Sequence, residues 1–211
     1  VLCSDAHKVF QQITGMGKRI VPDMMIHAPF RLKKSLIRMI QGESSAALEG
    51  RPSRIIAKMN SLTDPDIIKE LYKAARNGVK IDLIIRGICC LKPGIKGVSE
   101  NIRVVSIIGR FLEHTRVYYF ENNTPQLYCA SADWMERNLM HRIEVAFPIQ
   151  KKRLMNRIIE DLQWYLDDRC QSWELQSDGS YLHSDQSDSC EQEQVQTRLL
   201  NQLATVRYNS V

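Results

Sequence analysis

The sequence has no apolar run that could cross a membrane. Its longest apolar stretches, residues 81–85 and 104–108, are interrupted or flanked by polar and charged residues, whereas a membrane-spanning helix needs about 20 apolar residues. Residues 1–18 also lack an initiator methionine and the apolar segment of a signal peptide. We therefore expect no membrane span and no leader, and a chain that begins within a longer protein.

Metal-binding patterns are also scarce. The six cysteines, at positions 3, 89, 90, 129, 170 and 190, form no CxxC pair, and two adjacent cysteines cannot readily supply two ligands to one structural zinc. Four histidines have no second ligand at a metal spacing and are interpreted as structural: His7, His27, His141 and His183. The sequence thus predicts no metal site within the chain and cysteines that are reduced thiols.

Two common signatures of nucleotide and nucleic-acid binding are missing. No glycine-rich loop of the form Gly-x-x-x-x-Gly-Lys-Ser/Thr is present, because the glycines at 94 and 97 are not followed by Lys and Ser or Thr. The three tryptophans are not interleaved with basic residues as a nucleic-acid surface requires. P-loop kinase chemistry is excluded, and no nucleic-acid partner is expected.

The composition is that of an ordinary folded domain. Of 211 residues, 44% are hydrophobic and 25% are charged, and the net charge is +5, which fits one domain or slightly more. The charge is uneven: residues 1–60 hold ten Lys and Arg against four Asp and Glu, whereas residues 151–211 hold seven against ten. The basic part favours an anionic partner, and this signal alone suits nucleic acid, a membrane surface or phosphate equally well.

Apolar periodicity predicts alternating strands and helices. The predicted helices cover residues 4–14, 31–50, 64–77, 151–166 and 195–206, and the predicted strands cover 23–28, 54–60, 80–86, 101–108, 115–121, 126–130 and 142–147. The strand–helix–strand unit at 54–86 predicts a parallel pair, and Asn122-Asn123 suits a hairpin turn. From Gln176 the composition becomes polar, which predicts a flexible linker. The fold class is α/β, with a mixed sheet and helices on both faces.

Polar side chains close two neighbouring strands of this sheet. Lys58 and Asn60 end the first strand of the unit, and Arg86 ends the second, directly before Gly87. Ligands bind at the carboxyl ends of parallel strands, and a guanidinium can grip phosphate oxygens with two donors. These residues are candidate phosphate contacts, with Arg86 the best of them. Solvated strand ends are the alternative interpretation.

A second cluster enters the predicted hairpin. His114 and Arg116 lie two residues apart, and Ser131 and Asn138 follow the next strand. The phospholipase D superfamily uses a related pattern, His-x-Lys followed by a Ser/Asn loop. The imidazole can exchange a proton with a phosphate oxygen, and the cation can offset charge on a transferring group. A surface coincidence is the alternative for the His-x-Arg pair taken alone.

Longer motifs connect both clusters to a family. The stretches IIRGICCLKPG at 84–94 and GRFLEHTR at 109–116, with others between residues 54 and 149, resemble the C-terminal region of the large bacterial polyphosphate kinases. The resemblance implies transfer of the terminal phosphate of ATP to polyphosphate, reversibly and through a phosphohistidine. It implies two C-terminal halves that resemble phospholipase D.

The resemblance also assigns expected roles. Arg86 and His114 match residues that contact nucleotide or phosphate in the family, and His114 is expected to assist catalysis. The phosphorylated histidine and the groups that bind Mg²⁺ are expected outside this chain, which should be inactive alone. Residues 1–22 are expected to end the preceding catalytic half, 23–175 to form the phospholipase D-like domain, and 176–211 to form the linker and closing helix. ATP, ADP and polyphosphate are the expected ligands of a cytoplasmic homo-oligomer, which could associate peripherally with a membrane.

Two other functions remain open at this point. A phospholipase D-like phosphodiesterase would use His114 as the covalent nucleophile and would hydrolyse a phosphodiester without nucleotide. Arg116 in place of Lys argues against it. A non-catalytic polyphosphate-binding module would bind the polyanion without turnover, and the uneven charge supports that reading.

Overall fold

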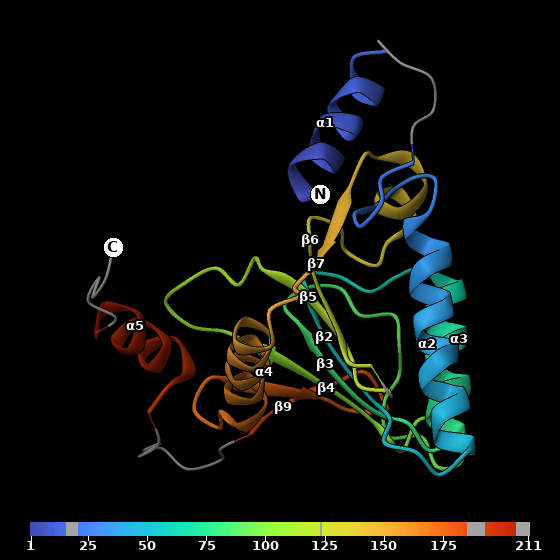
Figure 1. The fold of residues 1–211 in the computed structure, drawn as a ribbon. Coiled ribbons are helices and arrows are strands. Elements are labelled where there is room, and N and C mark those ends of the chain that lie inside the picture. Colours follow the sequence, from blue (N-terminus) through green and yellow to red (C-terminus); the bar gives the residue numbers. More distant parts are fainter. Residues whose placement is uncertain (16–20, 123, 185–192, 206–211) are drawn as a thin grey trace.

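The structure is a computed structural model that describes residues 1–15, 21–122, 124–184 and 193–205 (Figure 1). The helices are α1 (Leu2–Ile13), α2 (Leu32–Leu48), α3 (Pro65–Arg76), the π-helix η1 (Arg137–His141), α4 (Lys152–Asp167) and α5 (Val195–Thr205). The strands are β1 (Ile26–His27), β2 (Arg54–Met59), β3 (Lys80–Ile85), β4 (Ile102–Ile107), β5 (Arg116–Phe120), β6 (Gln126–Ala130), β7 (Val145–Pro148), β8 (Ser172–Leu175) and β9 (Tyr181–His183).

The described strands form one mixed sheet in the order β1-β7-β6-β5-β2-β3-β4-β8-β9. The pairs β2–β3 and β3–β4 are parallel, and the other pairs are antiparallel. Helices α2 and α3 cover one face, and α4 and α5 lie against the other (Figure 1). The predicted α/β class, with a mixed sheet and helices on both faces, is confirmed.

Each face of the sheet has its own apolar layer. On one side Leu36 of α2 and Leu71 of α3 pack with Ile55. On the other side Leu162 of α4 packs with Ile56. Adjacent residues of β2 therefore point into opposite layers, which explains why this strand is apolar along almost its whole length.

Helix α3 begins where local chemistry requires it to begin. The Asp64 carboxylate accepts hydrogen bonds from the backbone amides of Asp66 and Ile67, and Pro65 occupies the first helical position. Gly78, with φ of 98°, follows the last turn. These caps confirm the predicted strand–helix–strand unit and fix where β3 starts beside β2.

The C-terminal part corrects the sequence prediction. The predicted polar linker is wrong for Tyr181–His183, which form β9 and pair with β8, while β8 pairs with β4. Apolar and polar residues alternate here over only four residues, and the turn at Gly179 has a φ of 94°. In the sequence, so short a pattern cannot be distinguished from a polar loop. The sheet thus continues beyond residue 175. Residues 185–192 of the predicted linker lie outside the described residues.

Two predicted strands are shorter than expected. Residues 23–28 contribute only β1, because the amides of residues 23–25 bond to a side chain, as described below. The strand predicted at 142–147 begins at Val145, after η1 and its connection.

The prediction of reduced cysteines holds only in part. Cys3, Cys89, Cys90 and Cys129 are free. Cys170 is disulfide-bonded, so the prediction is wrong for that residue. Among the described residues, no helix combines the length and apolar character that a membrane crossing demands.

A buried carboxylate attaches α1 to the segment before β1. Asp5 accepts hydrogen bonds from the amides of Asp23 at 2.8 Å, Met24 at 2.6 Å and Met25 at 2.9 Å, and Lys8 bridges Asp5 and Asp23. Burial raises the pKa of Asp5, but the amides and Lys8 more than offset burial and hold that pKa well below its usual range.

The attachment of α1 should therefore weaken in acid. A carboxyl with a depressed folded-state pKa contributes stability above its unfolded pKa of about 3.9, and this stability is lost as the pH falls towards the folded value. We expect Asp5→Asn to lower the protection of the amides of residues 23–25 from hydrogen exchange at pH 6. The difference from the unaltered protein should shrink below about pH 4. A difference that does not depend on pH would contradict this account.

Candidate functional site

The ends of three strands meet at one edge of the sheet. Lys58 of β2 lies opposite Ile84 of β3 and opposite Val117 of β5. Since β2 and β3 run parallel and β5 runs antiparallel to β2, the ends of β2 and β3 meet the start of β5. All five predicted site residues lie at this edge: Lys58, Asn60, Arg86, His114 and Arg116.

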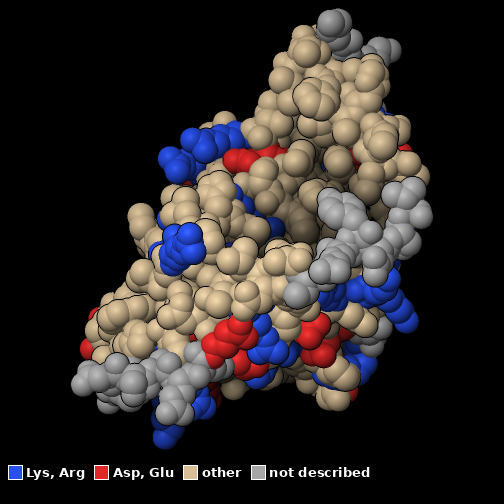
Figure 2. Space-filling view, turned by 90° about the vertical axis from the view of Figure 1, so that its left-hand side faces the viewer, with Lys and Arg blue, Asp and Glu red and all other residues tan. Residues whose placement is uncertain are grey.

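Two cavities lie beside the residues of this edge. In Figure 2, the surface is hollowed between the upper part, which carries α1, and the lower part, which carries α4 and α5, and blue Lys and Arg side chains lie at this hollow. A cavity of about 450 Å³ is lined by His114, Tyr165 and apolar residues of α5. A smaller cavity of about 280 Å³ lies at Arg86, between β4 and the β8–β9 hairpin.

One buried carboxylate organises the polar groups. Asp133, only 7% exposed, accepts from Nε and Nη2 of Arg116, each at 3.2 Å. It also accepts from the backbone amide of Asn60 at 2.7 Å and from its Nδ2 at 3.2 Å. Asp133 is therefore bonded to β2 and to the start of β5 at once, and it balances the buried part of Arg116.

Arg86 is oriented by Asn60. Its Nε and Nη2 both donate to Oδ1 of Asn60, at 3.1 and 3.0 Å. Within the described part of the chain, Nη1 of Arg86 has no bonded acceptor. The guanidinium is partly exposed, so this nitrogen is available to an external anion.

His114 contacts Arg116. Nη1 of Arg116 lies 3.0 Å from Nδ1 of His114 and 2.8 Å from its carbonyl oxygen. His114 is otherwise exposed at the lip of the larger cavity. Of the predicted phosphate contacts, Arg86 and His114 are thus the two with accessible nitrogens.

Lys58 lies deeper, in a cluster that sequence reasoning missed. Its Nζ is 2.8 Å from Glu113 Oε2 and 2.7 Å from Thr115 Oγ1, and it lies 4.8 Å from the centre of the Tyr165 ring. Glu113 also accepts from Tyr165 Oη at 2.9 Å and from Gln196 Nε2 at 2.7 Å. The ion pair is therefore enclosed by side chains from α4 and α5.

The electrostatics of this cluster follow from burial. Burial lowers the pKa of Lys58, and the nearby cations Arg86 and Arg116 lower it further, while Glu113 opposes both effects. Burial also raises the pKa of Tyr165, and the Glu113 carboxylate adds to this, so the phenol stays a proton donor.

The roles of Glu113, Asp133, Tyr165 and Gln196 had little signal in the sequence. In the sequence, the only indication of a role for Glu113 and Asp133 is that each lies next to residues of a recognised motif. Tyr165 and Gln196 lie on helices predicted only for packing or closure. Ser131 and Asn138, expected to support His114, instead both donate to Glu144.

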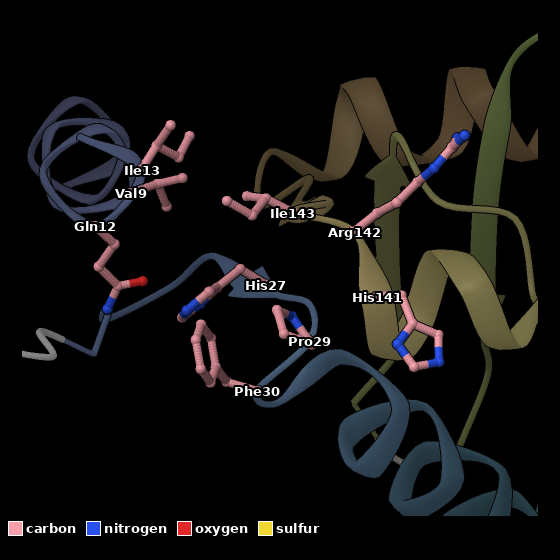
Figure 3. Close-up of a pocket in the computed structure, with 9 residues that line it drawn as sticks. All are labelled: Val9, Gln12, Ile13, His27, Pro29, Phe30, His141, Arg142 and Ile143. Carbon is pink, nitrogen blue, oxygen red and sulfur yellow. The ribbon is translucent and has the colours of Figure 1, made fainter. Parts of the chain in front are cut away.

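A third cavity, of about 420 Å³, lies apart from this edge, between α1, β1 and η1. Figure 3 shows Val9, Ile13 and Ile143 across it from His27 and Phe30, with Arg142 directed away. Its lining is mainly apolar, which does not suit a phosphate. Among the described residues no cluster of three His, Cys, Asp or Glu could hold a metal ion, so Mg²⁺ ligands outside this chain remain a prediction.

Comparisons with known proteins give a consistent result. Residues 25–196 match the family model described as "Polyphosphate kinase C-terminal domain 2". The chain is 52% identical over 204 residues to polyphosphate kinase of Pseudomonas aeruginosa, covering 96% of this chain and 30% of that protein. It is 53% identical to the Pseudomonas syringae pv. tomato enzyme, with 96% and 28% covered. The chain thus spans less than a third of these relatives' length.

Solved structures agree with the sequence comparisons. The crystal structure of polyphosphate kinase from Porphyromonas gingivalis superposes with a TM-score of 0.88 at 32% identity, covering 95% of this chain and 31% of that one. Nuc, a phospholipase D family member from Salmonella typhimurium, gives a TM-score of 0.53 at 17% identity, covering 72% and 97%. The second likeness shows the fold alone, and it confirms the predicted phospholipase D-like architecture.

The buried Lys58–Glu113 pair gives a prediction about stability. Glu113→Gln leaves the Lys58 ammonium buried without a counter-charge, and removing one partner of such a pair costs about 3–5 kcal/mol. We expect the double variant Lys58→Met with Glu113→Gln to recover much of this loss in urea unfolding. Asp161→Asn, which breaks the more exposed Arg157–Asp161 pair on α4, is the control and should cost only about 0.5 kcal/mol. Costs that simply add in the double variant would contradict the pairing.

Proposed function

This chain belongs to the polyphosphate kinase family, in the region of C-terminal domain 2, and from that premise we propose a specific part for it in the enzyme. It supplies nucleotide and phosphate binding to a reaction that transfers the terminal phosphate of ATP reversibly to polyphosphate. The transfer passes through a phosphohistidine that lies outside this chain.

The observation that carries the proposal is that Arg86 and His114 both lie at the same edge of the sheet, each beside a cavity. Arg86 presents a guanidinium nitrogen with no acceptor among the residues that the structure describes, and His114 presents an exposed imidazole. Arg86 is held by the buried Asn60, and His114 contacts the half-buried Arg116. A site whose donors are fixed before the ligand arrives loses little order on binding.

Phosphoryl transfer needs charge stabilisation more than covalent help from the protein. Arg86 binds a phosphate oxygen of the nucleotide or of the polymer end. His114 assists by donating a proton or a hydrogen bond to a phosphate oxygen and by steadying the leaving group. Neither residue is the covalent acceptor in this proposal.

Lys58, Asn60 and Arg116 have protein groups as their bonded partners in this structure. Direct phosphate contact by these three stays a prediction. The charges of Lys58 and Arg116 are balanced by Glu113 and Asp133, so Arg86 is the cation of this set without a carboxylate partner among the described residues. Mg²⁺ enters with ATP, and its protein ligands belong to the rest of the enzyme. We also propose that the complete protein is a homo-oligomer in the cytoplasm. Peripheral association with a membrane is compatible with this proposal.

The alternatives make different predictions. A phospholipase D-like phosphodiesterase with His114 as nucleophile hydrolyses a phosphodiester without nucleotide, yet that superfamily builds its site from two histidine motifs and this chain carries one His-x-Arg. A non-catalytic module binds polyphosphate without turnover. For this chain alone, our proposal and the module make the same prediction, and only the complete enzyme separates them.

Calorimetric titration of the chain with tripolyphosphate and with ATP tests the proposal. A lost charge-assisted hydrogen bond costs about 1.5–3 kcal/mol, so Arg86→Ala should weaken binding roughly 10- to 100-fold. His114→Ala should weaken it less, because a neutral donor is lost. Arg153→Ala, which removes an exposed arginine of α4, is the control for loss of one positive charge.

Three outcomes count against the proposal. Equal weakening by the control would mean that only overall charge matters. No binding by the unaltered chain would mean that this half forms no site of its own. Release of nitrophenol from bis(p-nitrophenyl) phosphate, abolished by His114→Ala, would favour the phosphodiesterase.

A further inference from the structure

The loop that carries His114 has little backbone structure of its own. It spans residues 109–115, between β4 and β5, and in Figure 1 it extends away from the sheet towards α5. Just before it, the amide of Ile108 donates to the carbonyl oxygen of Gln171. No backbone–backbone hydrogen bond joins residues 109–115 to another residue that the structure describes. Side chains therefore hold this loop in place.

Gln196 of α5 makes three hydrogen bonds to the loop. Its Oε1 accepts from the amide of Phe111 at 2.8 Å, and its Nε2 donates to the carbonyl oxygen of Phe111 at 2.8 Å. Nε2 also donates to Oε1 of Glu113 at 2.7 Å. Because the amide of Phe111 only donates and its carbonyl only accepts, these bonds also determine which way the carboxamide of Gln196 faces.

Gln196 reaches the loop from a fixed position. It lies in the first turn of α5 and is only 5% exposed. Its neighbour Val195, 1% exposed, belongs to the same apolar layer as Leu162 of α4. The amide of Val195 donates to Oδ2 of the buried Asp168, at the end of α4, at 2.6 Å. The first turn of α5 is thus attached to α4, which packs on the sheet.

Gly109 gives the two segments room to approach. A Cβ atom at this position would lie 2.6 Å from Oε1 of Gln196, and closer still to the side chain of Gln171. Such distances are shorter than real Cβ contacts, so a side chain at position 109 would displace Gln196. The contact between the loop and α5 therefore depends on a glycine here.

The same contact shapes the larger cavity at the site. Residues 111–115 line one side of this cavity of about 450 Å³, and Gln196, Leu199, Leu200 and Leu203 of α5 line the other. Gln196 also bonds to the loop, so it joins the two sides. The separation of the loop from α5, and with it the width of the cavity beside His114, is set where Gln196 meets Phe111.

We infer that Gln196 is a positioning residue for His114. By holding Phe111 and Glu113, it fixes the part of the loop that leads into His114, and α5 thereby serves the site and does more than close the fold. The use of this placement in phosphate binding rests on the proposed function. The contact itself is a property of this chain and can be measured without a ligand.

Hydrogen exchange followed by NMR tests the contact directly. In the unaltered chain, the amide of Phe111 should be protected although it lies in a loop. Gln196→Met keeps the length of the side chain and removes its hydrogen bonds, so it should lower this protection roughly tenfold. The amides of residues 54–59 in β2 should keep theirs. Gln202→Met, the same change at a residue of α5 that bonds to Arg157 of α4, is the control and should leave Phe111 protected.

Calorimetry with tripolyphosphate tests the positioning role. Gln196→Met should weaken binding about 2- to 10-fold. In a His114→Ala background it should weaken binding no further, because the group that the loop places is already missing. In an Arg86→Ala background its effect should remain. Gln202→Met should leave the affinity unchanged.

The inference is overturned if Phe111 exchanges as fast as an unstructured amide in the unaltered chain, or if Gln196→Met leaves its protection unchanged. Equal weakening of tripolyphosphate binding by Gln196→Met with and without His114 would also overturn the positioning role. If Gln196→Met does not fold, Gly109→Ala, which displaces Gln196 from the loop side, is judged by the same two measurements. Failure of the unaltered chain to bind tripolyphosphate, with Phe111 protected through Gln196, would count against the proposed function and leave the contact standing.

Discussion

Cationic groups meet at the ends of β2, β3 and β5, and the buried Asp133 carboxylate is the acceptor that lets them stay there. It bonds to Arg116 directly and reaches Arg86 through Asn60. Like charges at close range repel strongly when they are shielded from water. Without this acceptor, the two guanidinium groups would have no fixed positions, and neither the contact of Arg116 with His114 nor the free nitrogen of Arg86 would follow.

A second carboxylate, on the side of α4 and α5, also holds several polar groups in place. Glu113 pairs with Lys58 and accepts from Tyr165 and Gln196, so helices that pack on the sheet also fix the loop that carries His114. Gln196 further exchanges hydrogen bonds with the backbone of Phe111. The loop is thus held from the sheet by Asp133 and from the helices by Glu113, and the exposed imidazole lies between these two anchors.

Much of the fold could be predicted from the chain itself, because its signals are local. The β2–α3–β3 unit has apolar strands, an Asp-Pro start and a Gly stop, and its elements agree with the prediction within a residue or two. The β8–β9 hairpin could not be predicted, since its strands are short and partly exposed and are defined by pairing with β4.

The candidate site, like the fold, could be predicted from the sequence only in part. Strand ends and the His-x-Arg spacing identified the residues that converge, because register in a parallel pair follows from the strand boundaries. The partners of those residues could not be predicted: Asp133 and Gln196 come to Asn60 and Glu113 from distant parts of the chain. Lys58 and Arg116 have a sequence context that resembles that of a phosphate ligand, whereas their bonded neighbours include carboxylates, and phosphate contact by both stays a prediction.

The central claim is that this edge of the sheet is a preformed phosphate site, and a crystal of the chain soaked with tripolyphosphate tests it most directly. The account predicts phosphate density within hydrogen-bonding distance of Nη1 of Arg86 and of the His114 ring, with the Asp133 bonds to Arg116 and Asn60 unchanged. Density on another surface, such as the side of α3 that carries Lys69, Lys73 and Arg76, with none at Arg86 or His114, would contradict it.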